Sequence, residues 1–287
     1  MENKTFSAKP KQFWISYSKL STFSQCPLKY RFQYIDKLPT KPAPALFFGS
    51  TIHACLEWLH HPGDNADGAT RTLADLLDYL DTHWSPPAEF DAGALEQAGC
   101  TRERAEALLT EYYLKHVGHD AASGRTNEPE RAHAVEKKFK IDFDGDVVNG
   151  IIDRIDRIVD DNGAVSYEII DYKTNKKAPN RLYDEQLVQL AIYQWAAEEG
   201  TDWDRQALDF YPVNRAGLFF VVPEVNRKMF PERGLDVAAV KQEVRATIDK
   251  IKSATATLES DNDAFGPTPN KLCNWCDFQD LCPARSA

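Results

Sequence analysis

Two neighbouring segments decide the fold of this chain: VVNGIIDRIDRIV at residues 147–159 and AVSYEIIDYKT at residues 164–174. Both are rich in β-branched residues, and the turn residues DDNG at 160–163 separate them. This pattern predicts two antiparallel strands joined by a short turn. A third segment, AVEKKFKIDF at residues 134–143, precedes them and leads into the turn FDGD, so it extends the predicted sheet.

Acidic and basic side chains share faces on these strands, because side chains two residues apart on a strand point the same way. This period places Asp153 in a row with apolar neighbours and groups Asp171 with Lys173. The apolar members of the two rows are Ile151, Ile155 and Ile169. When the two strands pair through the short turn, the two carboxylates converge on one point, with the lysine beside them.

Two carboxylates a few ångströms apart cannot both stay ionised without a cation between them, and oxygen ligands suit hard divalent ions such as Mg²⁺ and Mn²⁺. The pattern therefore favours a metal site at Asp153 and Asp171. The same spacing also fits charges on a solvated strand face or a structural Asp–Lys pair. The spacing alone does not choose between these interpretations.

The chain beyond the two strands alternates between helical and extended patterns. An amphipathic helix is predicted over residues 182–199, and extended segments are predicted at 207–213 and 217–225. A final helix is predicted near residues 235–258. Three strands, a helix and two further strands indicate an α/β protein with a mixed central sheet flanked by helices.

The N-terminal part of the chain is predicted to be helical. Residues 13–38 fit one or two helices with a break near Pro27. Ser50 or Thr51 is a candidate N-cap for the next helix, which would place His53 in its first turn. Further helical patterns lie at residues 73–80 and 101–117, and residues 118–130 are polar and loose.

Composition and charge exclude several classes of protein. The 287 residues are 43% hydrophobic and 27% charged, which rules out collagen-like, low-complexity and wholly disordered chains. A formal net charge of −10 argues against a protein that coats nucleic acid, but it allows a local basic groove, for which residues 176–181 are a candidate. No apolar run approaches the roughly 18 to 20 residues that a bilayer helix needs, and no signal peptide is present, so we expect a cytoplasmic protein without membrane contact.

Three sequence motifs resemble those of the PD-(D/E)XK nuclease superfamily. They are GIIDRID at residues 150–156, IIDYKT at 169–174 and QLAIY at 189–193. The similarity is to the RecB-like and AddB-like branch, which includes nucleases of CRISPR adaptation, and it extends over residues 16–60, 146–195 and the cysteine-rich tail. The superfamily's proline before the first acid is replaced by Ile152. The resemblance implies a restriction-endonuclease-like core.

The resemblance also implies roles for individual residues. Three would bind the catalytic metal ion, Mg²⁺ or Mn²⁺: His53, Asp153 and Asp171. Five would form the catalytic group: Asp153, Asp171, Lys173, Gln189 and Tyr193. Lys173 would orient the attacking water and stabilise charge on phosphorus, while the last two, one helical turn apart, would position the lysine, the phosphate or the substrate strand.

The cysteines indicate a second metal site. Cys273, Cys276 and Cys282 form a compact set of thiolates, which is typical of a zinc ion or an iron–sulfur cluster. Cys26, in a Cys-Pro context, is the candidate fourth ligand. The resemblance favours a [4Fe-4S] cluster, with Zn²⁺ as the alternative. The two remaining cysteines, Cys55 and Cys100, are expected to be packed hydrophobes.

Together these patterns predict one nuclease domain over residues 1–287, with a helical insertion at 62–130 and a cluster-binding tail at 259–287 that pairs with Cys26. The expected function is a metal-dependent DNA exonuclease that acts on single-stranded ends in repair or recombination. The alternatives are a CRISPR adaptation nuclease that processes spacer precursors and an inactive DNA-binding subunit. The expected partners are single-stranded DNA and either a helicase, which would be a separate chain because no phosphate-binding loop is present, or CRISPR adaptation proteins.

Overall fold

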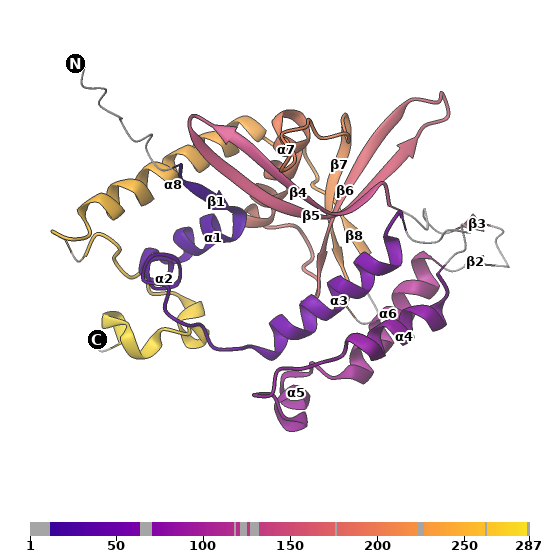
Figure 1. Ribbon diagram of the computed structural model, residues 1–287, viewed down its shortest axis with the longest axis horizontal. Coiled ribbons are helices and arrows are strands. Elements are labelled where there is room, and N and C mark those ends of the chain that lie inside the picture. The colour runs from indigo at the N-terminus through magenta and orange to yellow at the C-terminus, as the bar shows by residue number, and fades with distance from the viewer. Residues whose placement is uncertain are drawn as a thin grey trace, which may run out of the picture.

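A mixed sheet with helices on both faces forms the centre of the computed structural model (Figure 1). The structure describes residues 12–63, 71–117, 119–120, 125–126, 132–175, 177–222, 227–261 and 263–285. Within these residues the sheet has six strands in the order β1, β5, β6, β7 and β8, and β4 also pairs with β5. The strands are β1 (Trp14–Ser16), β4 (Ala134–Phe143), β5 (Asp146–Val159), β6 (Val165–Lys173), β7 (Val213–Phe220) and β8 (Arg227–Met229). A separate pair consists of β2 (His119–Asp120) and β3 (Arg125–Thr126).

The long strand β5 changes partner along one of its edges. β4 pairs antiparallel with residues 146–155 of β5. β1 pairs in parallel with residues 147–149, and β6 pairs antiparallel with residues 154–159. β1 and β6 therefore share the edge of β5 that faces away from β4, and the change of partner falls between residues 149 and 154.

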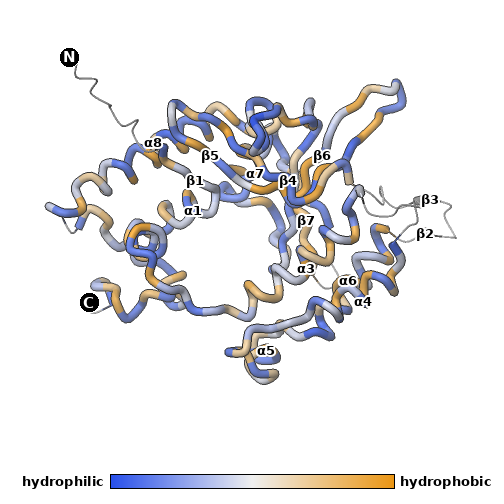
Figure 2. Tube along the Cα trace, viewed as in Figure 1, coloured by the Kyte–Doolittle hydropathy of each residue, from blue (hydrophilic) through white to orange (hydrophobic). Residues whose placement is uncertain are grey.

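Helices cover the two faces of the sheet. They are α1 (Tyr17–Gln25), α2 (Pro27–Tyr30), the π-helical turn η1 (Arg31–Ile35), α3 (Pro44–His60), α4 (Leu73–His83), α5 (Ala92–Ala98), α6 (Arg102–His116), α7 (Asp184–Glu199) and α8 (Val237–Thr257). One hydrophobic cluster packs α1, α7 and α8 against the face that presents Ile169. A second cluster packs α3, α4 and α6 against the face that presents Ile170. Figure 2 shows hydrophobic residues along the central strands, between these two helical layers.

The helical predictions are mostly confirmed. The break near Pro27 separates α1 from α2, and the helices predicted over residues 182–199 and 235–258 are α7 and α8. The predicted start of α3 is wrong, because this helix begins at Pro44, whose fixed φ suits the first helical position. The hydroxyls of Ser50 and Thr51 donate to the carbonyl of Phe47 inside the helix instead of capping it.

The strand predicted over residues 207–213 is also wrong. Pro212 has no N–H to offer to a ladder, and β7 begins only at Val213. The predicted α/β class with a mixed sheet between helices is confirmed. None of the helices in the described part of the chain has the length and apolar character that a bilayer-spanning helix needs.

Candidate active site

Asp153 lies where β5 separates from β6. The pairing of these two strands begins at Arg154 and Ile170. One residue further along β5, the Asp153 Oδ2 atom accepts a hydrogen bond of 2.7 Å from the backbone N–H of Tyr172. A buried backbone donor without an acceptor is costly. The Asp153 carboxylate therefore stabilises the backbone at the fork, the point where β5 and β6 separate. The same hydrogen bond holds the carboxylate in place.

The predicted row of Ile151, Asp153 and Ile155 is not maintained along β5. Ile152 and Ile155 are three residues apart, yet both pack in the first hydrophobic cluster, whereas Ile151 is 41% exposed. The regular alternation fails because β5 changes from one partner strand to another between these residues. On β6 the alternation holds, since Ile169 and Asp171 both lie on the side of α7.

Asp171 is the centre of a closed group of contacts with α7. Its Oδ1 atom accepts hydrogen bonds of 2.8 Å from Gln189 Nε2 and of 2.8 Å from the Tyr193 hydroxyl. The Lys173 ammonium lies 2.6 Å from Asp171 Oδ2 and donates a hydrogen bond of 3.0 Å to Gln189 Oε1. The structure thus brings together four of the five predicted catalytic residues in one group, in which Asp171, Gln189 and Tyr193 are buried and Lys173 is half-buried.

The Asp171 carboxylate is under electrostatic strain. Burial raises its pKa most strongly and the nearby Asp153 raises it further, while Lys173 acts in the opposite direction. The other carboxylate oxygen, Asp171 Oδ2, is contacted by the Lys173 ammonium at 2.6 Å. A buried oxygen of this kind has capacity for another positive ligand.

A second group contains the predicted ligand His53. Its Nδ1 atom lies 3.4 Å from Asp153 Oδ2, and one donor atom each of His53, Glu136 and Asp153 lie within 4.8 Å of one another. Burial lowers the pKa of His53, but the hydrogen bond and charge of Asp153 outweigh it, so the pKa is raised. Asp171 is not part of this three-residue set in the described chain, and the backbone of Tyr172 connects the two groups.

Glu136 is a site residue that the sequence analysis missed. Val135 pairs with Arg154 and Lys137 pairs with Ile152, so Glu136 stands across from Asp153. Its φ of +46° is rare for a residue with a side chain. The turn FDGD could have predicted the position of Glu136. A hairpin that pairs residues 143 and 146 also sets Glu136 opposite Asp153.

Comparison with known proteins identifies the family. The family model described as the PD-(D/E)XK nuclease superfamily matches residues 14–283. The chain belongs to the PD-(D/E)XK nuclease superfamily. The restriction-endonuclease-like fold is thereby confirmed, and membership implies a metal-dependent nuclease.

Two individual proteins show the extent of the similarity to this PD-(D/E)XK chain. The Gene 69 protein of Mycobacterium phage D29 is 23% identical over 291 residues, which cover 93% of this chain and 96% of the phage protein. The crystal structure of SSO0001 superimposes with a TM-score of 0.40 and 18% sequence identity, over 97% of this chain and 90% of that one.

The donor atoms present fit the divalent metal that PD-(D/E)XK nucleases use. One imidazole nitrogen and two carboxylate oxygens lie within 4.8 Å of one another, which is close to the spacing of ligands around one ion. The carboxylate of Asp171 lies in the neighbouring group, with its Oδ2 atom in contact with Lys173. Crowded carboxylates without enough hydrogen-bond donors are the expected surroundings of a bound cation.

The crowding of carboxylates raises the pKa of Glu136. Its pKa is raised from 4.5 to about 7, first by burial and then by the charges of Asp153 and Glu57, while His53 and Lys138 act in the opposite direction. The folded metal-free chain therefore binds a proton here more tightly than the unfolded chain does.

Glu136→Gln is expected to flatten the pH dependence of stability. Between pH 4.5 and about 7 the folded state keeps the Glu136 proton that the unfolded state loses, so stability falls as pH rises through this window. Thermal unfolding in EDTA, followed by circular dichroism between about pH 5 and about pH 8, should show a smaller fall in Tm for the variant than for the wild type. Parallel Tm profiles for the two proteins would contradict the pKa shift.

The cysteines of the tail meet the N-terminal helices. Four cysteines line one cavity of about 290 Å³: Cys26, Cys273, Cys276 and Cys282. The backbone N–H of Thr268 donates to Cys26 Sγ at 3.5 Å across 242 residues of sequence, and that of Asn270 donates to Cys273 Sγ at 3.3 Å. The structure therefore brings the predicted fourth cysteine to the other three.

The two remaining cysteines have no part in this cavity. Cys55 and Cys100 lie in the second hydrophobic cluster, which confirms that they are packed residues. Burial raises the pKa of the Cys55 thiol to about 12, so this thiol stays protonated and unreactive.

Proposed function

We propose that this protein is a divalent-metal-dependent DNA exonuclease of the RecB-like and AddB-like branch, acting on single-stranded ends in repair or recombination. The observation that carries the proposal is the closed group of Asp171, Lys173, Gln189 and Tyr193 beside Asp153. Such a group places carboxylates for a metal next to an ammonium that can approach a phosphate. The branch is supported by the motifs GIIDRID, IIDYKT and QLAIY.

In this proposal Asp153, Asp171 and His53 hold the metal ion, and Glu136, which has a donor atom within 4.8 Å of donor atoms of His53 and Asp153, is a further ligand. A bound divalent ion lowers the pKa of its water from about 15.7 toward neutrality and stabilises charge on the phosphoryl oxygens. Lys173, held in place by Asp171 and Gln189, orients the attacking water and stabilises the negative charge that develops on the phosphate.

Gln189 and Tyr193 hold the Asp171 carboxylate in place. Both donate to the same oxygen, Asp171 Oδ1, and Gln189 Nε2 also donates to the Tyr193 hydroxyl at 2.8 Å. These contacts fix the Asp171 carboxylate in one rotamer and leave its Oδ2 atom for Lys173 and the ion. Preorganisation of this kind avoids the cost of reorienting dipoles during the reaction.

Basic residues after β6 supply a place for the nucleic acid. Lys177 and Arg181 are exposed on the loop that follows Lys173, whereas Lys176 lies outside the described residues. The chain as a whole is acidic, with a formal net charge of −10. A local positive loop at the mouth of an acidic site favours binding of a single phosphate backbone there over general affinity for DNA.

The proposal is tested with single-stranded DNA labelled at either end, its duplex form and a circular single strand. The expected result is progressive shortening of the linear single strand in Mg²⁺ or Mn²⁺, no reaction in EDTA and an intact circle. Blocking one terminus at a time then gives the polarity. Cleavage of the circle would contradict an exonuclease, and intact linear strands in both metals would contradict nuclease function.

We also propose that the four cysteines bind a [4Fe-4S] cluster. The four cysteines line one cavity, and two backbone N–H groups donate to their sulfurs, as is typical of a thiolate-ligated cluster. The resemblance of the cysteine pattern to the AddB-like branch favours a [4Fe-4S] cluster over Zn²⁺.

Cys26→Ser is expected to remove the cluster and lower Tm strongly, because the N-terminal helices then lose their link to the tail. Anaerobic purification should give a brown wild-type protein with iron and sulfide in equal amounts, and a colourless variant. Cys100→Ala, which alters a cysteine outside the cavity, should stay brown. A colourless wild-type protein with one zinc ion per chain would contradict the cluster.

A further inference from the structure

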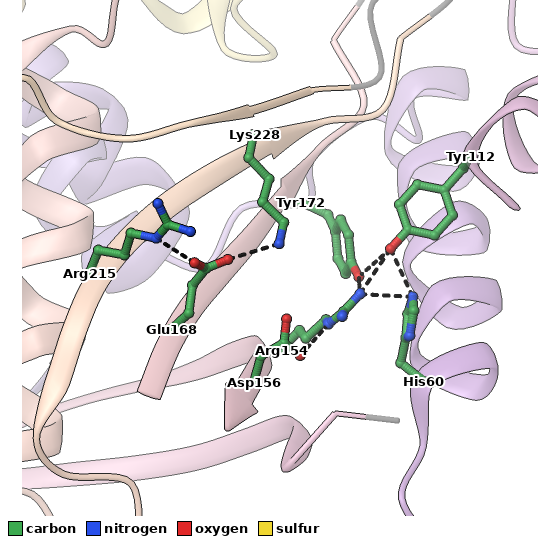
Figure 3. Close-up of polar contacts among 8 residues, drawn as sticks. All are labelled: His60, Tyr112, Arg154, Asp156, Glu168, Tyr172, Arg215 and Lys228. Carbon is green, nitrogen blue, oxygen red and sulfur yellow. Dashed lines mark hydrogen bonds and ion pairs between the residues drawn. The ribbon is translucent and has the colours of Figure 1, made fainter. Parts of the chain in front are cut away.

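A buried polar network surrounds the guanidinium of Arg154, which is 1% exposed (Figure 3). Its Nε atom donates to Asp156 Oδ1 at 2.6 Å. Its Nη1 atom lies 3.0 Å from the Tyr112 hydroxyl, 3.3 Å from the Tyr172 hydroxyl and 2.9 Å from His60 Nε2. The Tyr112 hydroxyl also contacts His60 Nε2 at 2.7 Å and the Tyr172 hydroxyl at 3.1 Å. We call these five residues the Arg154 network.

The charges of the network are balanced within the fold. Asp156 faces Glu168 across the strand pair, and both carboxylates are buried. Glu168 is neutralised by Arg215 at 2.5 Å and by Lys228 at 2.8 Å, so Arg154 remains the partner of Asp156 (Figure 3). Two buried carboxylates side by side are thus each held by cations.

The His60 Nε2 atom is shared by two members of the network. It lies 2.9 Å from Arg154 Nη1 and 2.7 Å from the Tyr112 hydroxyl. The Tyr112 hydroxyl accepts a hydrogen bond from Arg154, because a guanidinium has only donors. Removal of the Tyr112 hydroxyl would break its contacts with Arg154, His60 and Tyr172 and leave buried polar atoms without this partner.

Three elements that carry a candidate metal ligand also carry a network residue, whereas β4, which carries Glu136, does not. The pairs are Asp153 and Arg154 on β5, Asp171 and Tyr172 on β6, and His53 and His60 on α3. Seven residues are close to two full helical turns, so the two histidines of α3 lie on the same side of the helix. The His53 ring also packs edge-on against the Tyr172 ring, with centroids 6.0 Å apart.

We propose that the Arg154 network positions the metal-binding side chains by locking α3, β5 and β6 together, and that the predicted insertion at residues 62–130 takes part through Tyr112. This inference rests on the proposed function, because it assigns the network a role in metal binding. Tyr112 lies on α6 and is the member of the network that this segment contributes. The network residues act through their neighbours and do not themselves contact the ion.

Tyr112 is the most informative position to change. Its hydroxyl contacts Arg154, His60 and Tyr172, which lie on three different elements. Tyr112→Phe keeps the ring that packs among buried neighbours and removes only this shared contact. Residues that orient metal ligands typically change metal affinity by about 10- to 100-fold when altered. We expect Mn²⁺ binding by Tyr112→Phe to weaken about tenfold.

Tyr113→Phe is the matched control. Tyr113 is the next residue of the same helix, and its hydroxyl donates a hydrogen bond of 3.0 Å to the Arg71 carbonyl, away from the network. The same chemical change therefore removes a hydrogen bond on α6 without touching Arg154. This control should bind Mn²⁺ as the wild type does.

The experiment measures Mn²⁺ affinity of the metal-free full chain by electron paramagnetic resonance, with Tm recorded for each variant. Weaker binding in Tyr112→Phe and Tyr172→Phe, with wild-type affinity in Tyr113→Phe, would support the proposal. Wild-type affinity in both network variants, or equal losses in all three that follow Tm, would overturn it. Mn²⁺ binding is measured without DNA, so it does not depend on nuclease activity. A wild-type protein that binds Mn²⁺ but cleaves no DNA would contradict the proposed function, and the Mn²⁺ affinities of the variants would still test the role of the network.

Discussion

Asp171→Asn is expected to reduce DNA cleavage by a factor on the order of 10⁴ or more while the chain stays folded, the scale seen when a catalytic unit is disabled. The amide keeps the shape of the side chain but removes the charge that would bind the metal ion. Burial already disfavours the ionised form, since it raises the pKa of Asp171, so a neutral amide should not lower stability in EDTA. End-labelled single strands in Mg²⁺ and in Mn²⁺ give the rate, and thermal unfolding checks the fold.

The matched control is Asp142→Asn, which changes an exposed carboxylate on β4 of the same sheet. It should cleave at the wild-type rate. An Asp171→Asn protein that is fully active in Mg²⁺ would end the assignment of this carboxylate to the catalytic group.

Lys173→Met is expected to lower kcat by about 10²- to 10³-fold, the cost of removing one preorganised electrostatic donor. Methionine retains much of the aliphatic stem, and only the ammonium that contacts Asp171 and Gln189 is lost. Since the change removes a cation beside Asp171, Mn²⁺ affinity should stay the same or increase. Single-turnover rates at saturating Mn²⁺ separate this effect on chemistry from an effect on binding.

Lys177→Met serves as the control for charge alone. Lys177 is exposed on the following loop, so its replacement should weaken DNA binding modestly and leave the single-turnover rate unchanged. A Lys173→Met protein with a wild-type single-turnover rate would falsify the catalytic role of the ammonium.

Short-range patterns predicted a large part of the candidate site. Asp171 and Lys173 are two residues apart on a strand, and Gln189 and Tyr193 are four apart on a helix, so local periodicity alone puts each pair on one face. The structure shows both pairs in one group. That the strand pair contacts the helix pair was predicted from the family resemblance. The spacing of residues within one element does not show which other element their common face packs against.

The features that the sequence analysis missed depend on long-range register. Glu136 reaches Asp153 only through the pairing of β4 with β5. Arg154 finds Tyr112 across 42 residues and His60 across 94, contacts that no periodicity within a strand contains. The regular row around Asp153 failed for the same reason, since a change of partner strand is a property of the sheet.

The fork at Asp153 has a practical consequence for trapping a substrate complex. A catalytically inactive variant that still binds DNA must keep the backbone structure of the wild type. Asp153→Ala would leave the Tyr172 N–H facing a gap between β5 and β6, and so would disturb the very strands that present the other carboxylate. Asp171, whose hydrogen bonds come from side chains of α7, is therefore the better place to inactivate the protein for such a structure.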